Sequence, residues 1–197
     1  MVRTRTAAAQ GQPWVVRPAR LLVTGSRDWS DPQIVDQVLE AGLAALQIPI
    51  TQARLCTLVH GAGRGLDELA AEHAARMGMT LEPHPADWSR LGRRAGPERN
   101  QEMVAAGADL CIGFPLGRLG SGVSRGTWGT VAAARAAGIP TLVVWGRRLH
   151  AYDIDEHQVH RPDNVSAGLL IAAQRRCCAW ITDPGPAVGI DQLVVPF

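Results

Sequence analysis

The segment that decides the fold runs from residue 97 to residue 140. It begins with PERNQEM at 97–103, continues with the apolar run ADLCIGFP at 108–115 and SRGT at 124–127, and ends with AAGIP at 136–140. A proline followed by an acidic residue is typical of a helix start, and a short apolar run that stops at a proline is typical of a buried strand. The segment therefore predicts a helix, a strand, a glycine-rich loop and a second helix that leads into the next strand.

The same alternation extends along most of the chain. Apolar runs at 20–24 and 56–60 are each followed by a glycine, a shorter strand is predicted at 79–84, and another at 141–145. In the intervening segments apolar residues recur at helical spacing. Strands that alternate with helices predict an α/β fold, here a Rossmann-like, mostly parallel, doubly wound sheet with helices on both faces.

The length of the chain predicts a single domain. Its 197 residues, 46% of them hydrophobic, are enough for one compact domain with a sizeable core. We expect a flexible N-terminal tail at 1–19, the domain itself at 20–146, and a polar C-terminal extension at 147–197 that packs on the same domain. A further helix is predicted at 165–178 within this extension.

The cysteines and the hydropathy pattern indicate the compartment. Cys56, Cys111, Cys177 and Cys178 lack the spacing of metal ligands, and two of them lie in predicted strands, so we expect buried, reduced thiols. The first 19 residues have no apolar stretch long enough for a signal peptide, and no later run reaches the ~20 apolar residues of a membrane span. We therefore expect a cytoplasmic protein that does not contact membranes.

The charge pattern bears on partners and metals. A formal net charge of +2 is too small to predict a nucleic-acid-binding protein, although all 20 basic residues are arginines. Arginine pairs with phosphate through two parallel hydrogen bonds. His150, His157 and His160 lie among acidic residues, but their spacing matches no metal-binding template. We expect no metal, no cofactor and no nucleic-acid partner.

Four segments that follow strands or begin helices carry the candidate binding site. They are residues 24–27, 60–65, 93–100 and 124–127, and in a doubly wound sheet they lie at the carboxyl ends of the strands, where ligands bind. Glycine permits close approach of the backbone to an anion, and arginine neutralises it. The pattern predicts one cleft for a phosphate-bearing ligand. The residues expected to bind phosphate are Gly25, Ser26, Arg27, Gly61, Gly63, Arg64, Gly65, Arg99, Asn100, Arg125, Gly126 and Thr127.

Several side chains near these loops allow two interpretations. Trp29 and Trp88 each follow an acidic residue beside a predicted ligand loop, where an indole either stacks on a base or packs in the core. Glu98 is either a favourable charge at a helix start or an acid beside Arg99. Asp67, in the first turn of the helix after the second glycine loop, is explained by the helix dipole.

The motifs together resemble a known family. VTGSRDW at 23–29, VHGAGRG at 59–65, PADW at 85–88, AGPERNQEM at 95–103 and GT at 126–127 are similar to the YspA-like branch of the SLOG superfamily. That superfamily groups the DNA-processing protein DprA with the LOG phosphoribohydrolases. The resemblance implies a nucleotide-binding Rossmann-like domain over about residues 21–144, a nucleotide-derived small molecule as ligand, and a homodimer.

The resemblance also bears on activity. LOG enzymes use a Glu-Arg-Lys motif, which Glu98-Arg99-Asn100 resembles with asparagine in place of lysine, and this implies catalytic roles for Glu98 and Arg99. They also use a glutamate shortly after a Gly-Thr pair, and the corresponding positions 128–130 hold no acid. Binding of a nucleotide-derived phosphorylated ligand is therefore the leading hypothesis. The alternatives are a LOG-like phosphoribohydrolase that cleaves the N-glycosidic bond of a nucleoside monophosphate, and a DprA-like single-stranded nucleic-acid binder.

Overall fold

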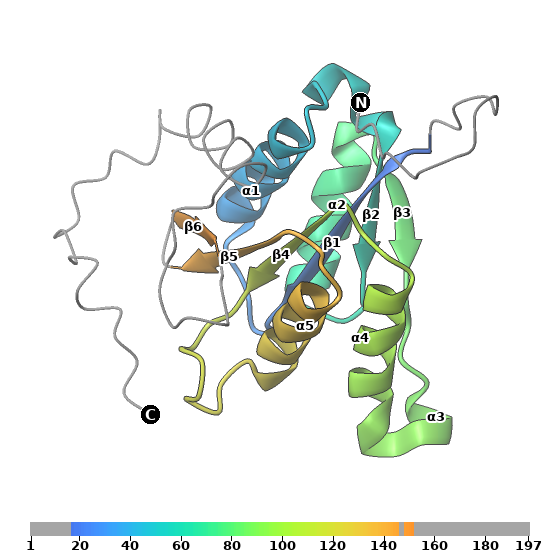
Figure 1. Cartoon of the computed structure of the whole chain (residues 1–197), viewed down its shortest axis with the longest axis vertical. Helices are drawn as coiled ribbons and strands as arrows, with labels where there is room; N and C mark the ends of the chain where they lie inside the picture. Colours follow the sequence, from blue (N-terminus) through green and yellow to red (C-terminus); the bar gives the residue numbers. More distant parts are fainter. Residues whose placement is uncertain (1–16, 146–147, 152–197) are drawn as a thin grey trace, which may run out of the picture.

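Five short strands pair in parallel to form one sheet (Figure 1). The computed structural model describes residues 17–145 and 148–151, and within them the strand order is β3-β2-β1-β4-β5-β6. All neighbouring pairs are parallel except β5 and β6. This is the predicted Rossmann-like arrangement. The strands are β1 (Ala19–Gly25), β2 (Cys56–His60), β3 (Thr80–Pro83), β4 (Leu110–Phe114), β5 (Thr141–Trp145) and β6 (Arg148–Ala151).

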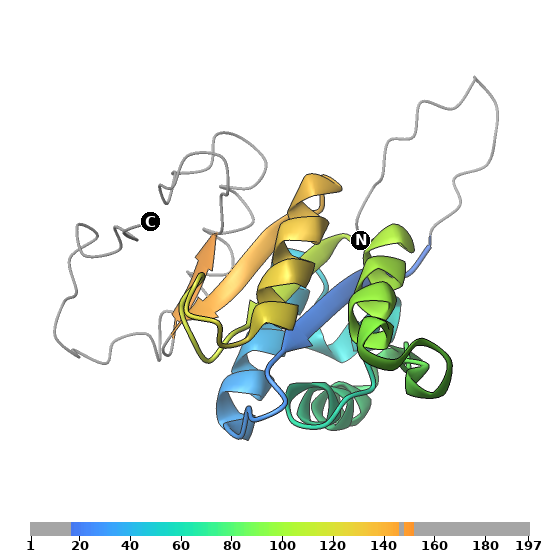
Figure 2. The ribbon, with the colours of Figure 1, turned by 90° about the horizontal axis from the view of Figure 1, so that it is seen from below.

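The helices cover both faces of the sheet, which makes it doubly wound (Figure 2). Helices α1 and α2 pack together on one face, and α4 and α5 pack together on the other. The short helix α3 lies next to the start of α4. The helices are α1 (Pro32–Ala45), α2 (Leu66–Met77), α3 (Trp88–Leu91), α4 (Ala95–Ala105) and α5 (Arg125–Ala136), with two 3₁₀ turns, η1 (Ile50–Leu55) and η2 (Gly92–Arg94).

The helix boundaries follow from local chemistry. Asp31 caps α1, where its Oδ1 accepts a hydrogen bond from the Ile34 N–H at 3.1 Å, and Pro32 occupies the first helical position. Gly78 ends α2 in a left-handed conformation with φ at +82°. Helix α4 begins at Ala95, two residues before the predicted start at Pro97. Proline is tolerated in the first turn because the N–H groups there have no partner within the helix.

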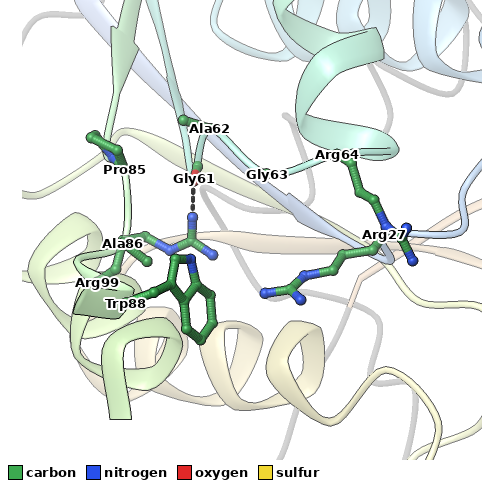
Figure 3. A pocket seen from close by; sticks show the side chains of 9 residues that line it. All are labelled: Arg27, Gly61, Ala62, Gly63, Arg64, Pro85, Ala86, Trp88 and Arg99. Atoms are coloured by element: carbon green, nitrogen blue, oxygen red, sulfur yellow. Dashed lines mark hydrogen bonds between the residues drawn. The ribbon is translucent and has the colours of Figure 1, made fainter. Parts of the chain in front are cut away.

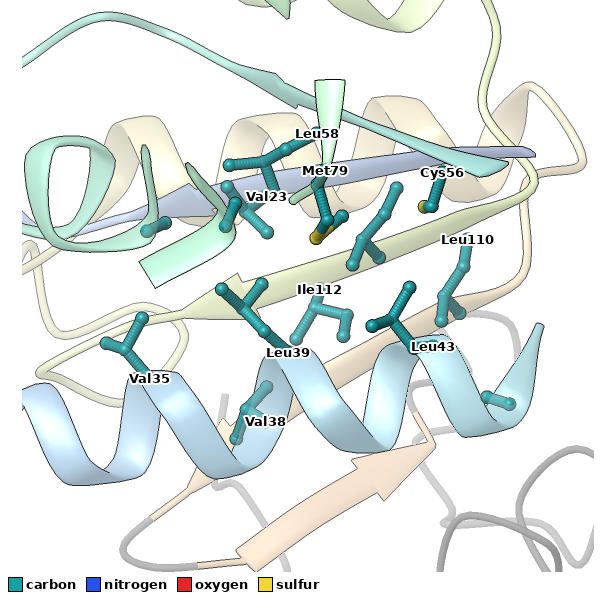
Figure 4. Packing of buried hydrophobic residues seen from close by; sticks show 14 of the residues in the cluster. Val23, Val35, Val38, Leu39, Leu43, Cys56, Leu58, Met79, Leu110 and Ile112 are labelled. Carbon is teal, nitrogen blue, oxygen red and sulfur yellow. The ribbon is translucent and has the colours of Figure 1, made fainter. Parts of the chain in front are cut away.

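Alternate residues of the central strands form two separate cores. Leu21 and Val23 of β1 face α1 and α2 in the larger core, part of which Figure 4 shows. Leu22 faces the opposite side, where it packs with Val59 and Met103 of α4. A strand that buries both of its faces reads as a continuous apolar run, which is why the pattern at 20–24 predicted β1.

The two cysteines within the described residues are buried and free, as expected. Cys56 lies in β2 and Cys111 in β4. Burial raises the pKa of each thiol to about 12. Both are therefore protonated, unreactive core residues at neutral pH.

The sheet extends beyond the predicted domain limit at residue 146. Residues 148–151, expected to begin a polar extension, form β6, which runs antiparallel to β5 with Leu142 opposite Ala151. The predicted helix at 165–178, most of the N-terminal tail, Cys177 and Cys178 lie outside the described residues. In the part of the chain that the structure describes, no helix has the length and apolar character needed to cross a membrane.

Candidate functional site

A pocket of about 440 Å³ lies beyond the carboxyl ends of β1, β2 and β3 (Figure 3). The loops after these three strands contribute most of its walls, and α4 contributes one side chain. Six of the residues predicted from sequence are brought together here. The lining residues are Arg27, Gly61, Ala62, Gly63, Arg64, Pro85, Ala86, Trp88 and Arg99.

One side of the pocket is formed by an arginine that covers an indole. The Arg27 guanidinium carbon lies 5.1 Å from the centre of the Trp88 ring, a cation–π distance, and Figure 3 shows the two side chains pointing toward one another. Trp88 is 49% exposed. Its ring is backed by Gly96 of α4, where an added Cβ would lie 3.3 Å from the ring. Trp88 is thus held in place and open to solvent.

Arg99 joins two of the loops that form the pocket. Its Nη1 donates to the carbonyl oxygens of Gly61 and His84, and its Nε donates to Asn100 Oδ1 at 2.8 Å. Burial lowers the pKa of the guanidinium, and the charge of Asp67 opposes this shift. Among the described residues, Nη2 has no hydrogen-bond partner. Arg99 therefore connects the loops after β2 and β3 to α4.

In the glycine loop at residues 61–65, side chains of α2 bind two of the backbone N–H groups. The Gly63 N–H donates to Asp67 Oδ2 at 3.0 Å, and the Gly65 N–H donates to Glu68 Oε2 at 3.4 Å. Backbone N–H groups in such loops are the usual ligands of phosphate. Here carboxylates of the chain itself fill two of these positions.

His60 and Asp67 are buried close to this loop, and burial shifts their pKa values in opposite directions. The Ala62 N–H donates to His60 Nδ1 at 3.3 Å. Burial lowers the pKa of His60, so the ring is neutral at pH 7 with its proton on Nε2. Burial raises the pKa of Asp67, which is 9% exposed, although the Gly63 N–H and the charge of Arg99 act against this shift.

The glycines of this region are required by contacts within the protein. A Cβ on Gly61 would overlap the guanidinium of Arg99, and a Cβ on Gly65 would overlap the backbone oxygen of Arg27. Gly65 also has φ at +75°. A Cβ on Gly25 would likewise overlap the side chain of Leu66. Parts of the chain itself therefore lie next to these glycines, and the expectation that the glycines also admit a ligand's phosphate stays a prediction.

Trp29, Glu98 and Ser26 are among the predicted residues that lie outside the pocket. Trp29 is 8% exposed, packs edge-on against Phe114 with ring centres 5.3 Å apart, and donates its indole N–H to the Asp31 carbonyl. It is a core residue and offers no face to a base. Glu98 pairs with Arg94 at 2.8 Å on the outside of α4. Ser26 belongs to the turn after β1, where its carbonyl accepts from the Leu66 N–H at 3.2 Å.

The start of α5 lies at the same edge of the sheet as the pocket but does not contribute to its walls. Ser124, Arg125, Gly126 and Thr127 do not line the pocket, which corrects the expectation that all four loops share one cleft. Asn100 connects the two places, since its Nδ2 donates to the Gly126 carbonyl at 3.4 Å. The first turn of α5 holds no acidic residue, and the side chain of Ser124 does not cap the helix.

Sequence reasoning missed part of the site. Pro85 and Ala86 line the pocket, and Asp67 fixes one of its loops, yet none was predicted to do so. Position after β3 was the available signal for Pro85 and Ala86, because ligand contacts in parallel sheets come from residues that follow strands. For Asp67, the signal was an acid four residues after a loop glycine.

A doubly wound parallel sheet with a ligand-sized pocket beyond the carboxyl ends of its strands defines a Rossmann-like α/β protein of the ligand-binding type. A model of the YspA, cpYpsA-related SLOG family matches residues 19–91, which include β1, β2 and β3 and the loops that follow β1 and β2. The chain belongs to this family, as its motifs predicted.

Individual proteins are similar to longer parts of the chain. Gene 61 protein of Mycobacterium phage D29 is 41% identical over 128 residues, which are 62% of this chain and 94% of the phage protein. Among solved structures, DprA of Streptococcus pneumoniae matches 85% of this chain with a TM-score of 0.47 and 15% identity, and this chain spans only 57% of that protein.

A second DprA structure, from Helicobacter pylori, is described as showing that protein's binding mode for single-stranded DNA. It matches 90% of this chain and 79% of its own, with a TM-score of 0.41 and 16% identity. Similarities at this level say nothing about a ligand of the present protein.

Proposed function

We propose that the protein binds a nucleotide-derived, phosphorylated small molecule in the pocket between the loops after β1, β2 and β3. The observation that carries the proposal is the pairing of cationic side chains with an exposed indole, Trp88, around a space of about 440 Å³. Pockets for small ligands generally measure about 300–1,000 Å³. Membership of a SLOG family supports a nucleotide as the ligand class.

The phosphate is assigned to Arg27 and Arg64. Arg64 pairs with Asp28 at 3.5 Å, but the two side chains are 71% and 76% exposed, so this ion pair is weak and readily exchanged. A phosphate with up to two negative charges and three acceptor oxygens is a stronger partner for two guanidinium groups. In this proposal the phosphate replaces Asp28 as the partner of Arg64.

The base is assigned to Trp88, Pro85 and Ala86. These residues form the apolar part of the pocket, and a base would stack on the Trp88 ring in the place that the Arg27 guanidinium now takes. The ligand is thus oriented with its planar ring toward the loop after β3 and its phosphate toward the loops after β1 and β2.

The residues favour binding over hydrolysis. Cleavage of an N-glycosidic bond passes through a cationic state that a carboxylate stabilises. Within the described part of the chain no carboxylate lines the pocket, and Glu98 is bound to Arg94. The hydrolase alternative therefore has no supporting observation. The predicted homodimer stays a prediction, to be checked by light scattering.

The test is calorimetric titration of the protein with AMP and with adenosine. We expect AMP to bind at least about tenfold more tightly, since charge-assisted hydrogen bonds contribute about 1.5–3 kcal/mol. The Arg64→Ala variant should lose most of this difference. Arg54→Ala is the matched control, because Arg54 is exposed at the end of η1, away from the pocket.

Three outcomes would contradict the proposal. Equal affinity for AMP and adenosine would mean that the pocket does not bind the phosphate group. Release of free adenine, followed by chromatography, would establish the hydrolase. Tight, strongly salt-dependent binding of a single-stranded oligonucleotide together with no binding of AMP would favour the nucleic-acid alternative.

A further inference from the structure

Asp67 contacts the glycine loop at residues 61–65 from inside the protein. Its Oδ2 accepts the Gly63 N–H at 3.0 Å, its side chain is buried, and it is absent from the pocket lining on the other side of the loop. Glu68 makes a similar contact with the Gly65 N–H at 3.4 Å. The loop therefore presents to the pocket a backbone with at least two of its N–H groups already bound.

A carboxylate and a phosphate compete for the same kind of donor. Both are anions that accept hydrogen bonds from backbone N–H groups at the start of a helix. An N–H that donates to Asp67 at 3.0 Å with the geometry of a normal hydrogen bond is not free for a second anion. A phosphate at the Gly63 N–H would have to displace a buried carboxylate, which would then lose one of its hydrogen-bond partners.

We infer that Asp67 is a specificity-determining residue: it occupies the loop N–H groups that a phosphate would otherwise bind, and so confines the ligand's phosphate to Arg27 and Arg64. The inference rests on the proposed function of the pocket. Asp67 acts through the loop and is a positioning residue, because it does not contact the ligand space.

The surroundings of Asp67 keep its carboxylate in this position. Arg99 of α4 and His60 of β2 are the ionisable groups that act on it, together with the N–H groups of Gly61 and Gly63. The charge of Arg99 favours the ionised carboxylate, and burial opposes it. Because either form of the carboxyl group accepts a hydrogen bond, the loop contact needs the oxygen atom more than the charge.

The experiment is a titration of the folded protein with inorganic phosphate, followed by NMR. The signals are the backbone amide of Gly63 and the side-chain Nε–Hε groups of Arg27 and Arg64. The variants are Asp67→Ala, which removes the acceptor, and Asp67→Asn, which keeps an acceptor oxygen without the charge.

In the wild type, phosphate should shift the two arginine signals and leave Gly63 unchanged. In Asp67→Ala the Gly63 amide should shift with phosphate, since its N–H is now free, and its hydrogen exchange should be at least about tenfold faster. In Asp67→Asn the Gly63 amide should exchange slowly, and phosphate should leave its chemical shift unchanged, as in the wild type. A merely structural role would not predict that phosphate shifts the Gly63 amide in Asp67→Ala but not in Asp67→Asn.

A measurement without phosphate covers the case in which Asp67→Ala does not fold. In the wild type the Gly63 amide should follow a carboxyl titration whose midpoint lies above the ordinary pKa of 3.8, because burial raises the pKa of Asp67. The amide of Gly78, at the far end of α2, is the control and should not follow it.

The inference is overturned if phosphate shifts Gly63 in the wild type as strongly as in Asp67→Ala. It is also overturned if folded Asp67→Ala leaves Gly63 insensitive to phosphate, or if no carboxyl titration reaches Gly63. If Gly63 depends on Asp67 as expected but phosphate leaves Arg27 and Arg64 unshifted, the phosphate site of the proposed function is wrong, and the contact between Asp67 and the loop stands.

Discussion

The start of α2 and the start of α5 look alike in sequence and differ in charge. Each has glycine and arginine next to a helix start at the same edge of the sheet. The first turn of α2 contains Asp67 and Glu68, whose carboxylates bind the preceding loop. The first turn of α5 contains no acid, and Arg125 is its first residue. One helix start is filled by anions of the chain, and the other is not.

The difference shows what a glycine-rich loop can mean. At α2, glycine is needed because Arg99 and the backbone of Arg27 fill the space where a side chain would be. At α5, an added Cβ on Gly126 would find its nearest atom, Asn100 Nδ2, at 4.0 Å. Glycine and arginine alone do not identify a phosphate loop, whereas the acids that follow distinguish the two helix starts.

The largest expected effect comes from replacing the two glycines. Gly65→Ala should lower the free energy of unfolding by about 2–4 kcal/mol, because φ is +75° and the new methyl group overlaps the Arg27 carbonyl. Gly126→Ala should change it by less than about 0.5 kcal/mol or stabilise α5 slightly. Urea unfolding measures both. Equal effects of the two substitutions would remove the contrast between the two loops.

The next effect concerns the tryptophan beside the loop. Trp88→Ala should weaken AMP binding by about 1–3 kcal/mol, the usual contribution of base stacking on an aromatic side chain. Trp88→Phe should keep most of the affinity, since a stacking face remains. Calorimetry gives both values, with unfolding curves to check that α3 and α4 are intact. Full AMP affinity in Trp88→Ala would mean that the base does not stack on Trp88.

The two arginines provide a direct comparison of the two helix starts. Arg27→Ala should weaken AMP binding by about 1–2 kcal/mol through loss of a charge-assisted hydrogen bond. Arg125→Ala, at the start of α5 and outside the pocket, should leave the affinity unchanged. A larger loss of AMP affinity in Arg125→Ala than in Arg27→Ala would indicate that the phosphate binds at the start of α5.

The smallest expected effect compares two acids whose pKa values shift in opposite directions. Glu82 of β3 accepts from Arg20 Nη2 at 2.7 Å, and this contact lowers the pKa of Glu82 from 4.5 to about 2. Burial raises the pKa of Asp67 above its ordinary 3.8. The stabilisation by Glu82 is therefore present above pH 4.5 and lost as the pH falls toward 2, whereas ionisation of Asp67 costs stability as the pH rises.

At pH 7, Glu82→Gln should accordingly be less stable than the wild type by about 1 kcal/mol, a value reduced for the partial exposure of Glu82. Asp67→Asn should be at least as stable as the wild type. In urea unfolding, the difference in free energy of unfolding between each variant and the wild type should become smaller as the pH falls from 7 to 3. A loss of stability in Asp67→Asn that is independent of pH would mean that asparagine does not replace the loop contact.

Much of the fold could be predicted because the central strands are buried on both faces. The runs at 56–60 and 141–145 coincide with β2 and β5, since continuous apolar stretches are what two helical layers require. The strand β6 was missed. Its four residues, Arg148–Ala151, are a short run within a polar stretch, and its place at the sheet edge comes from antiparallel pairing with β5.

The site could be predicted only in part, because the sequence does not show which neighbour fills a space. Arg27, Arg64 and Trp88 were identified as ligand candidates, and all three line the pocket. Trp29 carries a similar local signal, yet Phe114 and the rest of the core enclose it. The acceptor of the Gly63 N–H is four residues away on the next turn of chain, where only the folded backbone brings it into contact.

If the pocket binds a ligand as proposed, the contact between Arg27 and Trp88 would affect which ligands enter it. The guanidinium rests against the indole, and a ligand that took its place on this ring would have to displace it, at a cost of about 0.5–2 kcal/mol. A planar base would offset this cost by stacking in the same position, whereas a sugar phosphate without a ring cannot. Under the proposed function, this contact would therefore favour aromatic ligands before any specific hydrogen bond is formed.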